Sequence, residues 1–195
     1  MHPVMNRNLF FVKEHLGIFK AANNYDILDP QTQQIIMNCR EEKLGILTKL
    51  LRFTDYKRYT PFEITIRTPD GTEVLTVKRG ASFLRSKVHV LDGSGVLIGG
   101  FKQKLFAFRA AFTVHDAGDK DLFTLQGKWS SWEFTFKSDE QELAKVSKKW
   151  AGLGRELFTT ADNYMLQISD QVPADNPVRL LIVGAVMCID MVLRE

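Results

Sequence analysis

The segment FEITIRTPDGTEVLTVKR, residues 62–79, has the pattern of a β-hairpin. Apolar and polar side chains alternate from Phe62 to Arg67, which is the two-residue period of a strand with one buried face. The alternation breaks at Pro69-Asp70-Gly71, a sequence typical of tight turns, and a second strand-like run follows from Val74 to Val77. The segment therefore predicts two antiparallel strands joined by a short turn.

The same strand–turn–strand pattern recurs along the chain. The other units run from Tyr25 to Met37, Lys87 to Ile98, Ala111 to Leu125 and Trp132 to Val146, and a sixth, weaker unit starts at Asn163–Ile168. Six such units predict about twelve antiparallel strands, which must close or stack because open sheet edges invite aggregation. The chain is therefore mainly β, and the pattern alone favours either a barrel or a sandwich.

The C-terminal segment Pro177–Leu193 breaks the β pattern. Proline suits the first position of a helix, and ten apolar residues follow without interruption from Leu180 to Ile189. A bilayer span needs about 20 apolar residues, whereas runs of roughly 10–14 are more often buried core helices. A barrel of about twelve strands has a lumen that must be filled. We therefore expect the helix to lie inside the barrel rather than in a membrane.

Two overlapping segments between the first and second units also depart from the pattern. Glu41–Phe53 places leucines at helical spacing and predicts a short amphipathic helix or lid. Leu50–Tyr59 mixes aromatic and basic residues, which suits either a membrane interface or an ordinary capping helix and loop. We favour the ordinary capping helix and loop.

Length and composition fit one soluble domain that spans residues 1–195. The chain is 45% hydrophobic and 25% charged, with a net charge of +3 that is too mild to predict nucleic-acid binding. Cys39 and Cys188 lie far apart in the sequence, and we expect both to be reduced, buried thiols. Because no signal-peptide pattern opens the sequence, we expect a cytoplasmic protein.

No residue pattern predicts catalysis. The four histidines, His2, His15, His89 and His115, are scattered without metal-ligand spacing. Gly93-Ser94-Gly95 lies between two expected strands with no helix after it, so it reads as a hairpin turn and not as a phosphate loop. We expect neither enzymatic activity nor a cofactor.

In the segments described above and several shorter stretches, the chain resembles the phospholipid scramblases and their Tubby-like relatives, including the plant LURP-one-related proteins. The matching stretches are Tyr25–Pro30, Val77–Arg79, Leu97–Gly99 followed by Gln103, Val146–Gly152, Glu156–Tyr164 and Ile189-Asp190. This resemblance implies a Tubby-like closed barrel of twelve strands around a buried hydrophobic C-terminal helix. It covers nearly the whole chain from Tyr25 onward.

The sequence departs from the scramblase pattern where that pattern implies a function. The proline-rich extension and lipidated cysteine cluster of eukaryotic scramblases are not present in this sequence. Their acidic calcium-binding stretch is degenerate here, with Thr160 at its first acidic position, Gln171 at its last, and Asp162 and Asp170 remaining. Because calcium takes 6–8 oxygen ligands, we expect no tight metal site.

Basic residues gather on neighbouring strands of the expected barrel. Lys78, Arg79, Arg85 and Lys87 fall at adjacent strand ends, while Lys102 and Lys104 share one face of the next strand. Lys145, Lys148 and Lys149 form a second group. Such residues can simply solvate a barrel exterior. The first group also resembles the surface with which Tubby domains bind anionic lipid headgroups, and we expect it on the outside.

The sequence thus favours a non-enzymatic domain that contacts anionic phospholipid headgroups or a protein partner. We expect it in the cytoplasm, at the inner membrane face when it is bound to lipid. One alternative is a membrane-inserted scramblase that moves lipids between leaflets. Another is a structural or interaction module without lipid affinity.

Overall fold

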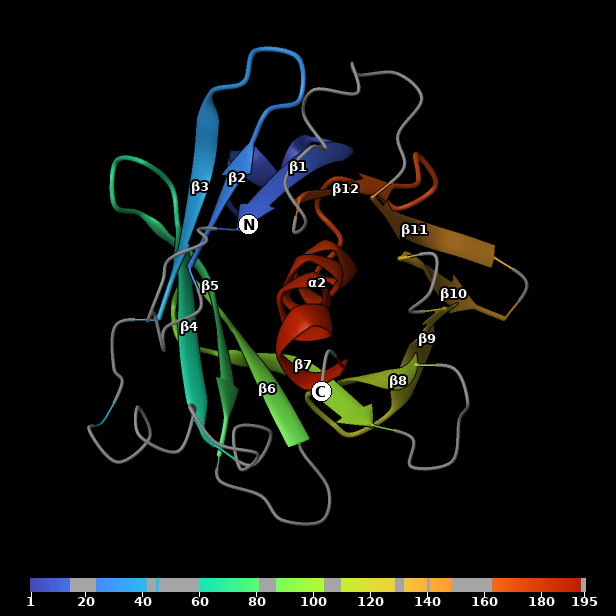
Figure 1. Cartoon of the computed structure of the whole chain (residues 1–195). Coiled ribbons are helices and arrows are strands. Elements are labelled where there is room, and N and C mark those ends of the chain that lie inside the picture. The colour runs from blue at the N-terminus through green and yellow to red at the C-terminus, as the bar shows by residue number, and fades with distance from the viewer. Residues whose placement is uncertain are drawn as a thin grey trace.

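Twelve antiparallel strands close into one barrel around a C-terminal helix in the computed structural model (Figure 1). The structure describes residues 1–14, 24–41, 45, 60–80, 87–103, 110–128, 132–139, 141–148 and 163–193. Consecutive strands pair with each other, and β1 pairs with β12 to complete the circle. The predicted barrel is therefore confirmed, and the sandwich is excluded.

The elements have the following bounds. The strands are β1 (Leu9–Glu14), β2 (Tyr25–Leu28), β3 (Ile35–Arg40), β4 (Phe62–Arg67), β5 (Glu73–Arg79), β6 (Lys87–Asp92), β7 (Leu97–Gln103), β8 (Ala110–Asp116), β9 (Asp121–Lys128), β10 (Glu133–Ser138), β11 (Gln141–Ser147) and β12 (Asn163–Ile168). A short 3₁₀ helix, η1 (Pro3–Asn6), precedes β1, and helix α2 (Val178–Leu193) follows β12.

Aspartate side chains hold four of the tight turns that the sequence predicts. One carboxylate oxygen in each turn accepts a hydrogen bond from a backbone N–H two residues later, at 2.8–3.1 Å. The four residues are Asp29, Asp70, Asp92 and Asp116. Each turn therefore carries its own hydrogen-bond acceptor, which explains why the hairpin pattern is legible in the sequence.

The first and last strands differ from the prediction. The sixth unit, at Asn163–Ile168, is a single strand and not the start of another hairpin, because α2 follows it. This strand, β12, pairs with β11 on one side. On its other side it pairs with β1, where Leu9 is opposite Gln167 and Lys13 is opposite Asn163. The sequence pattern did not predict β1. The barrel therefore contains five hairpins plus one strand from each end of the chain.

Helix α2 fills the lumen, as its apolar run predicts. Side chains from Leu180 to Val183 and from Ala185 to Ile189 are buried, and the helix contacts β5, β6 and β7. A Cβ on Gly184 would lie 3.4 Å from methyl groups of Val77 and Val90, so the helix backbone runs close to β5 and β6. In the described part of the chain, no helix is both long and apolar enough to cross a membrane.

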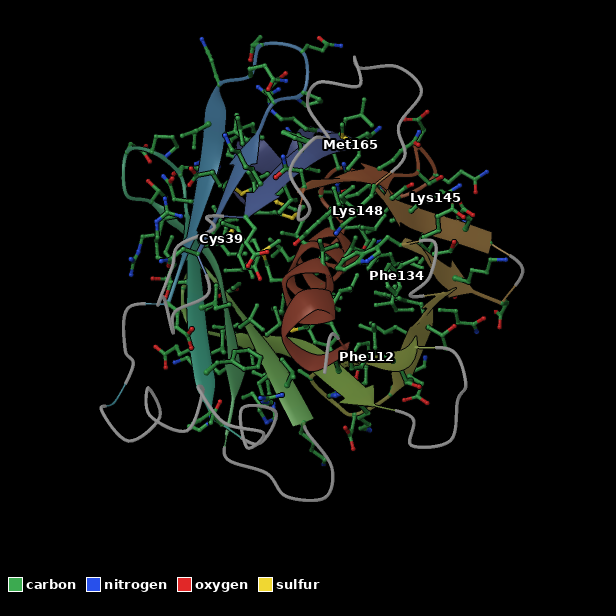
Figure 2. The ribbon with its side chains drawn as sticks, viewed as in Figure 1. Cys39, Phe112, Phe134, Lys145, Lys148 and Met165 are labelled. Carbon is green, nitrogen blue, oxygen red and sulfur yellow. The ribbon has the colours of Figure 1, made fainter. Side chains whose placement is uncertain are left out.

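The inner wall supplies aromatic and aliphatic side chains to the same core. Phe112 and Phe134 lie on the inner side of the barrel, where Figure 2 shows their side chains around α2. Cys39 and Cys188 are both buried and free, which confirms the expectation for the two thiols. Burial raises the pKa of both well above the ordinary value, so neither is a reactive thiolate.

A buried arginine fastens α2 to the N-terminal segment. Arg179 is 1% exposed, and its Nε donates to the carbonyl of Met5 at 2.8 Å. Nη1 donates to the carbonyl of Val172 at 2.7 Å, and Nη2 donates to Asn8 Oδ1 and to the carbonyl of Arg7. These acceptors satisfy a guanidinium that would be costly to bury alone. These hydrogen bonds of Arg179 join the start of α2 to the N-terminal segment that precedes β1.

Two predictions fall largely or wholly outside the described residues. They are the helix or lid at Glu41–Phe53, of which only Glu41 and Gly45 are described, and the aromatic-basic segment Leu50–Tyr59.

Replacing Val183 by Asp should unfold the domain. Val183 is 1% exposed, and an uncompensated buried carboxylate costs several kcal/mol against a typical net stability of about 5–15 kcal/mol. Val96→Asp is the matched control, because Val96 is 58% exposed and should tolerate the change within about 0.5 kcal/mol. Denaturant unfolding followed by circular dichroism compares the two variants. A wild-type transition for Val183→Asp would contradict the burial of α2.

Candidate functional site

Three of the six predicted basic residues lie on one outer face of the barrel. Lys87 of β6 is the direct cross-strand partner of Lys102 of β7. Lys78 of β5 is the partner of His89, which lies two residues beyond Lys87 on the outer side of β6. We call Lys78, Lys87 and Lys102 the lysine face. The structure therefore brings together side chains from three neighbouring strands.

Arg79 is not on this face, and the expectation that it lies outside is wrong. It is 5% exposed, because successive residues of a strand point to opposite sides and Arg79 follows the inward parity of Val77. Its Nη2 donates to the carbonyl of Thr60 at 2.8 Å, and its guanidinium lies 4.8 Å from the ring centroid of Phe62. Arg79 thus serves the buried side of the wall. The remaining two predicted residues, Arg85 and Lys104, lie outside the described residues.

Carboxylates accompany two of the three lysines. Lys78 Nζ is 3.4 Å from Glu63 Oε2, and Lys102 Nζ is 2.7 Å from Asp119 Oδ1. Within the described ranges, Lys87 is exposed and has no ion pair. The hydrogen bond from Lys102 holds the pKa of Asp119 below its usual range, and the charge of Lys87 acts in the same direction. Both carboxylates were missed by the sequence analysis.

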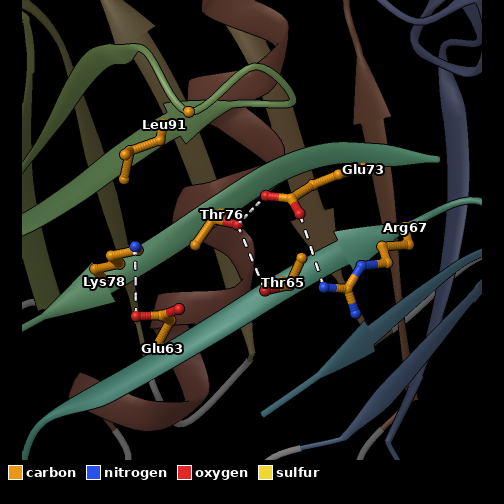
Figure 3. A pocket seen from close by; sticks show the side chains of 8 residues that line it. Glu63, Thr65, Arg67, Glu73, Thr76, Lys78 and Leu91 are labelled. Atoms are coloured by element: carbon orange, nitrogen blue, oxygen red, sulfur yellow. Dashed lines mark hydrogen bonds and ion pairs between the residues drawn. The ribbon is translucent and has the colours of Figure 1, made fainter. Parts of the chain in front are cut away.

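A polar hollow of about 190 Å³ adjoins Lys78 on the outer wall (Figure 3). Its lining residues are Glu63, Thr65, Arg67, Glu73, Thr76, Lys78, Leu91 and Gly95. Arg67 is 3.7 Å from Glu73, whose Oε1 accepts a hydrogen bond from Thr76 Oγ1 at 2.7 Å. Figure 3 shows one ion pair toward each end of the hollow and the two threonines between them. The hollow thus offers cations, carboxylates and hydroxyl groups to a small polar ligand.

The second basic group is divided in the structure. Lys145 is exposed on the outer wall of β11. The Lys148 ammonium lies 3.5 Å from the ring centroid of Trp132, a cation–π contact between the residues that flank β10 and β11. Lys149 lies outside the described residues. Only Lys145 therefore resembles the exposed Lys87 of the lysine face.

The remnant of the calcium motif does not form a cation site from the residues that the structure describes. Asp170 accepts a hydrogen bond from Asn8 Nδ2 at 2.5 Å, and the Gln171 side chain accepts one from Gln141 at 2.8 Å. No group of three or more His, Cys, Asp or Glu side chains is arranged to hold a metal within these ranges. Thr160 and Asp162 lie outside them. We therefore derive no calcium-dependent step.

A second histidine, His115, lies near the lysine face on the outer side of β8. It is buried on β8, where its ring packs against Gly100, and its Nδ1 lies 3.0 Å from the carbonyl oxygen of Asp116. The same Nδ1 is 3.4 Å from Asp119 Oδ1. Sequence spacing gave no sign of this arrangement, because it depends on the pairing of β7 with β8.

Comparison with known proteins gives one consistent result. A family model described as Scramblase matches residues 6–195. The chain is 28% identical over 185 residues to a phospholipid scramblase family protein of Schizosaccharomyces pombe, with 90% of this chain and 48% of that protein covered. It is 23% identical over 197 residues to phospholipid scramblase 2 of Homo sapiens, with 93% and 64% covered. No solved structure matches the chain.

A third relative carries a different kind of name. The chain is 27% identical over 198 residues to Altered inheritance rate of mitochondria protein 25 of Saccharomyces cerevisiae, with 89% of this chain and 60% of that protein covered. Across these three relatives, the chain spans 48–64% of the relative's own length. The matches name the scramblase family and do not address the Tubby-like part of the resemblance, which stays a prediction.

Arg79→Gln should destabilise the domain much more than Lys78→Gln. Arg79 donates a buried hydrogen bond to Thr60, and a buried acceptor that loses its donor costs about 1–3 kcal/mol. Lys78 makes a solvent-exposed ion pair, which contributes about 0–1 kcal/mol. Urea unfolding of the two variants measures the difference. Equal losses would contradict the opposite placement of these adjacent residues.

Calcium should not bind tightly. The remnant motif lacks carboxylates at both ends, and Asp170 already accepts a hydrogen bond from Asn8. Isothermal titration calorimetry should show no saturable binding at micromolar calcium. Saturable binding that Asp162→Ala abolishes would overturn this prediction.

Proposed function

Because the chain belongs to the scramblase family, we propose that it binds phospholipid headgroups on the outer wall of its barrel. We propose a binding domain and not an enzyme, in keeping with a sequence in which no catalytic motif was found. The headgroup contacts the lysine face and the adjoining hollow. The domain acts as a peripheral protein at the cytoplasmic surface of a membrane.

The hollow beside Lys78 is the observation that carries this proposal. At about 190 Å³ it is smaller than the roughly 300–1,000 Å³ of drug-sized ligand pockets, so it suits a compact polar group rather than an acyl chain. Thr65 brings a hydroxyl group that can donate to a phosphate oxygen, and Thr76 can do so once its hydroxyl leaves Glu73. Lys78 and Arg67 add positive charge, and Arg67 presents the planar fork of donors that suits phosphate.

Attraction to an anionic surface adds to this local chemistry. A lysine or arginine near an anionic leaflet contributes about 1 kcal/mol. The lysine face and Arg67 supply four positive charges, and Glu63, Glu73 and Asp119 supply three negative charges beside them, which leaves a net charge of +1. So small an excess supports recognition of a headgroup at short range more than diffuse attraction.

Insertion of α2 into a bilayer is a less favourable way for this chain to act on lipids. Leaving the barrel would remove the buried side chains of Leu180–Val183 and Ala185–Ile189 from the core that they share with the wall. In a bilayer the helix would stay away from water, but the apolar side chains of the wall that it leaves would not, and each large aliphatic side chain that loses its burial costs roughly 1.5–3 kcal/mol. We therefore propose that the domain binds lipid with α2 in place.

Vesicle binding tests the proposal. The full chain should bind vesicles of phosphatidylcholine with phosphatidylserine at low salt and ignore pure phosphatidylcholine vesicles. Binding should weaken as salt rises, because exposed charges are screened beyond about 8 Å at physiological ionic strength. The combined variant Lys78→Gln, Lys87→Gln and Lys102→Gln should bind at least about tenfold more weakly, since each lysine contributes about 1 kcal/mol.

A matched triple variant separates local from diffuse binding. Lys13, Lys137 and Lys145 are exposed lysines of β1, β10 and β11. Changing these three to Gln removes the same net charge and should weaken binding by much less. Equal losses would contradict a site on the lysine face. If the wild-type chain ignores anionic vesicles at low salt, the headgroup proposal fails and an interaction module without lipid affinity becomes the leading explanation.

A further inference from the structure

The turn between β8 and β9 places a carboxylate against the lysine face. Asp119 Oδ1 lies 2.7 Å from Lys102 Nζ and 3.4 Å from His115 Nδ1. The Asp119 side chain is 59% exposed, so solvent reaches the carboxylate from the other side. An anionic ligand that approaches Lys102 from the outer wall therefore competes with Asp119.

Two like charges meet across the strands beside this carboxylate. Lys87 and Lys102 occupy directly opposite positions on β6 and β7, where like charges destabilise a sheet. Both lower the pKa of Asp119, Lys102 chiefly by its hydrogen bond and Lys87 by its charge. Asp119 thus supplies a negative charge beside the two lysines, because Asp92, the carboxylate of β6, is engaged in the turn at the other end of the strand.

The place of His115 on the outer wall is set by its contact with Gly100 of β7. His115 packs on Gly100, and a Cβ on Gly100 would lie 2.1 Å from the carbonyl oxygen of Val88. His115 Nε2 is buried and has no hydrogen-bond partner among the described residues. The imidazole therefore has one nitrogen beside Asp116 and Asp119 and one unsatisfied nitrogen beside Gly100.

The Asp119 side chain has no visible task in its own turn. Asp116 Oδ1 accepts the hydrogen bonds that hold the turn, from the N–H groups of Gly118 and Lys120 at 2.9 and 3.0 Å. Asp119 has a φ of 69°, a left-handed conformation that Asp and Asn both adopt with little strain. Its carboxylate can therefore leave Lys102 while the turn stays intact.

We propose that Lys87 and Lys102 form a phosphate-binding position, and that the carboxylate of Asp119 competes with phosphate for it. This inference rests on the proposed function and deepens it, because it assigns one phosphate position on the lysine face and names the group that must be displaced. The phosphate of a lipid headgroup and free phosphate share the chemistry that this position recognises. Removal of the Asp119 charge should therefore strengthen binding.

Titration with inorganic phosphate tests the position without any lipid. The full chain, uniformly labelled with ¹⁵N, is followed by NMR at the backbone amides of Gly100 and Lys102. Asp119→Asn should bind at least about fivefold more tightly than the wild type, which corresponds to about 1 kcal/mol for one charge at the site. Adding Lys102→Gln to Asp119→Asn should abolish this gain.

Asp139→Asn is the matched control. Asp139 is also exposed and also has a positive φ, of 50°, in a hairpin turn, so the substitution has the same charge and backbone consequences. If Asp119→Asn binds phosphate no better than Asp139→Asn, the inference is wrong. If neither variant shows saturable shifts up to 50 mM phosphate, a concentration chosen as the ceiling for a weak but specific site, it is wrong as well.

A second arm repeats the comparison with phosphatidylserine vesicles in phosphate-free buffer. A gain for Asp119→Asn over Asp139→Asn supports both the phosphate position and its use for lipid. A gain with inorganic phosphate but no vesicle binding by any variant supports the position and contradicts the lipid-headgroup proposal. Vesicle binding that is the same for Asp119→Asn and Asp139→Asn leaves the lipid proposal standing and contradicts competition by Asp119.

Discussion

The apolar helix α2 must be kept from water, and the rest of the structure is organised around that requirement. Its side chains from Leu180 to Val183 and from Ala185 to Ile189 are buried. A helix that is apolar on every side has no face to present to solvent, so a single layer packed against it cannot bury it. A closed barrel surrounds it completely and, by closing, also removes the sheet edges that would otherwise be open to aggregation.

Closure depends on the two ends of the chain meeting. β1 supplies the strand that β12 needs, and Arg179 binds the carbonyl groups of Met5 and Arg7 just ahead of β1. The guanidinium therefore fixes α2 and the closing strand with one side chain. Because a buried arginine is tolerated only when its donors are satisfied, helix position and barrel closure stabilise each other.

Local sequence patterns predicted most of the fold. They did not predict strand β1 or the contacts of Arg179, because both depend on residues far apart in the sequence. Each hairpin carries its own alternation and turn residues, so five of them could be read directly from the sequence. β1 has no hairpin partner next to it in the chain, and the Arg179–Met5 hydrogen bond joins residues 174 positions apart. No local pattern reports such contacts.

The candidate site shows the same difference between what local patterns predict and what long-range strand pairing decides. Lys78 and Arg79 are adjacent in sequence, and counting their charges together hid the fact that a strand sends them to opposite sides. Glu63 could have been placed on the same face as Lys78 from the alternation of the two strands, although a register shift between Ile66 and Arg67 means that counting back from the turn would miss the pair by one residue. Asp119 could not, because its contact with Lys102 requires β7 and β8 to be placed in register first.

Among the described residues, α2 and the inner wall share one apolar core, and the ligand site that we propose lies on the outside. An outward residue of a strand can change without disturbing the core, so charge can gather there at little cost in stability. On the lysine face, however, two of the three cations already have carboxylate partners, and the net excess is small. Selectivity on such a surface comes from which carboxylate a ligand can displace and which hydroxyl groups it can then reach. If the proposed site is correct, the arrangement of Glu63, Asp119 and the threonines should matter more to binding than the number of lysines.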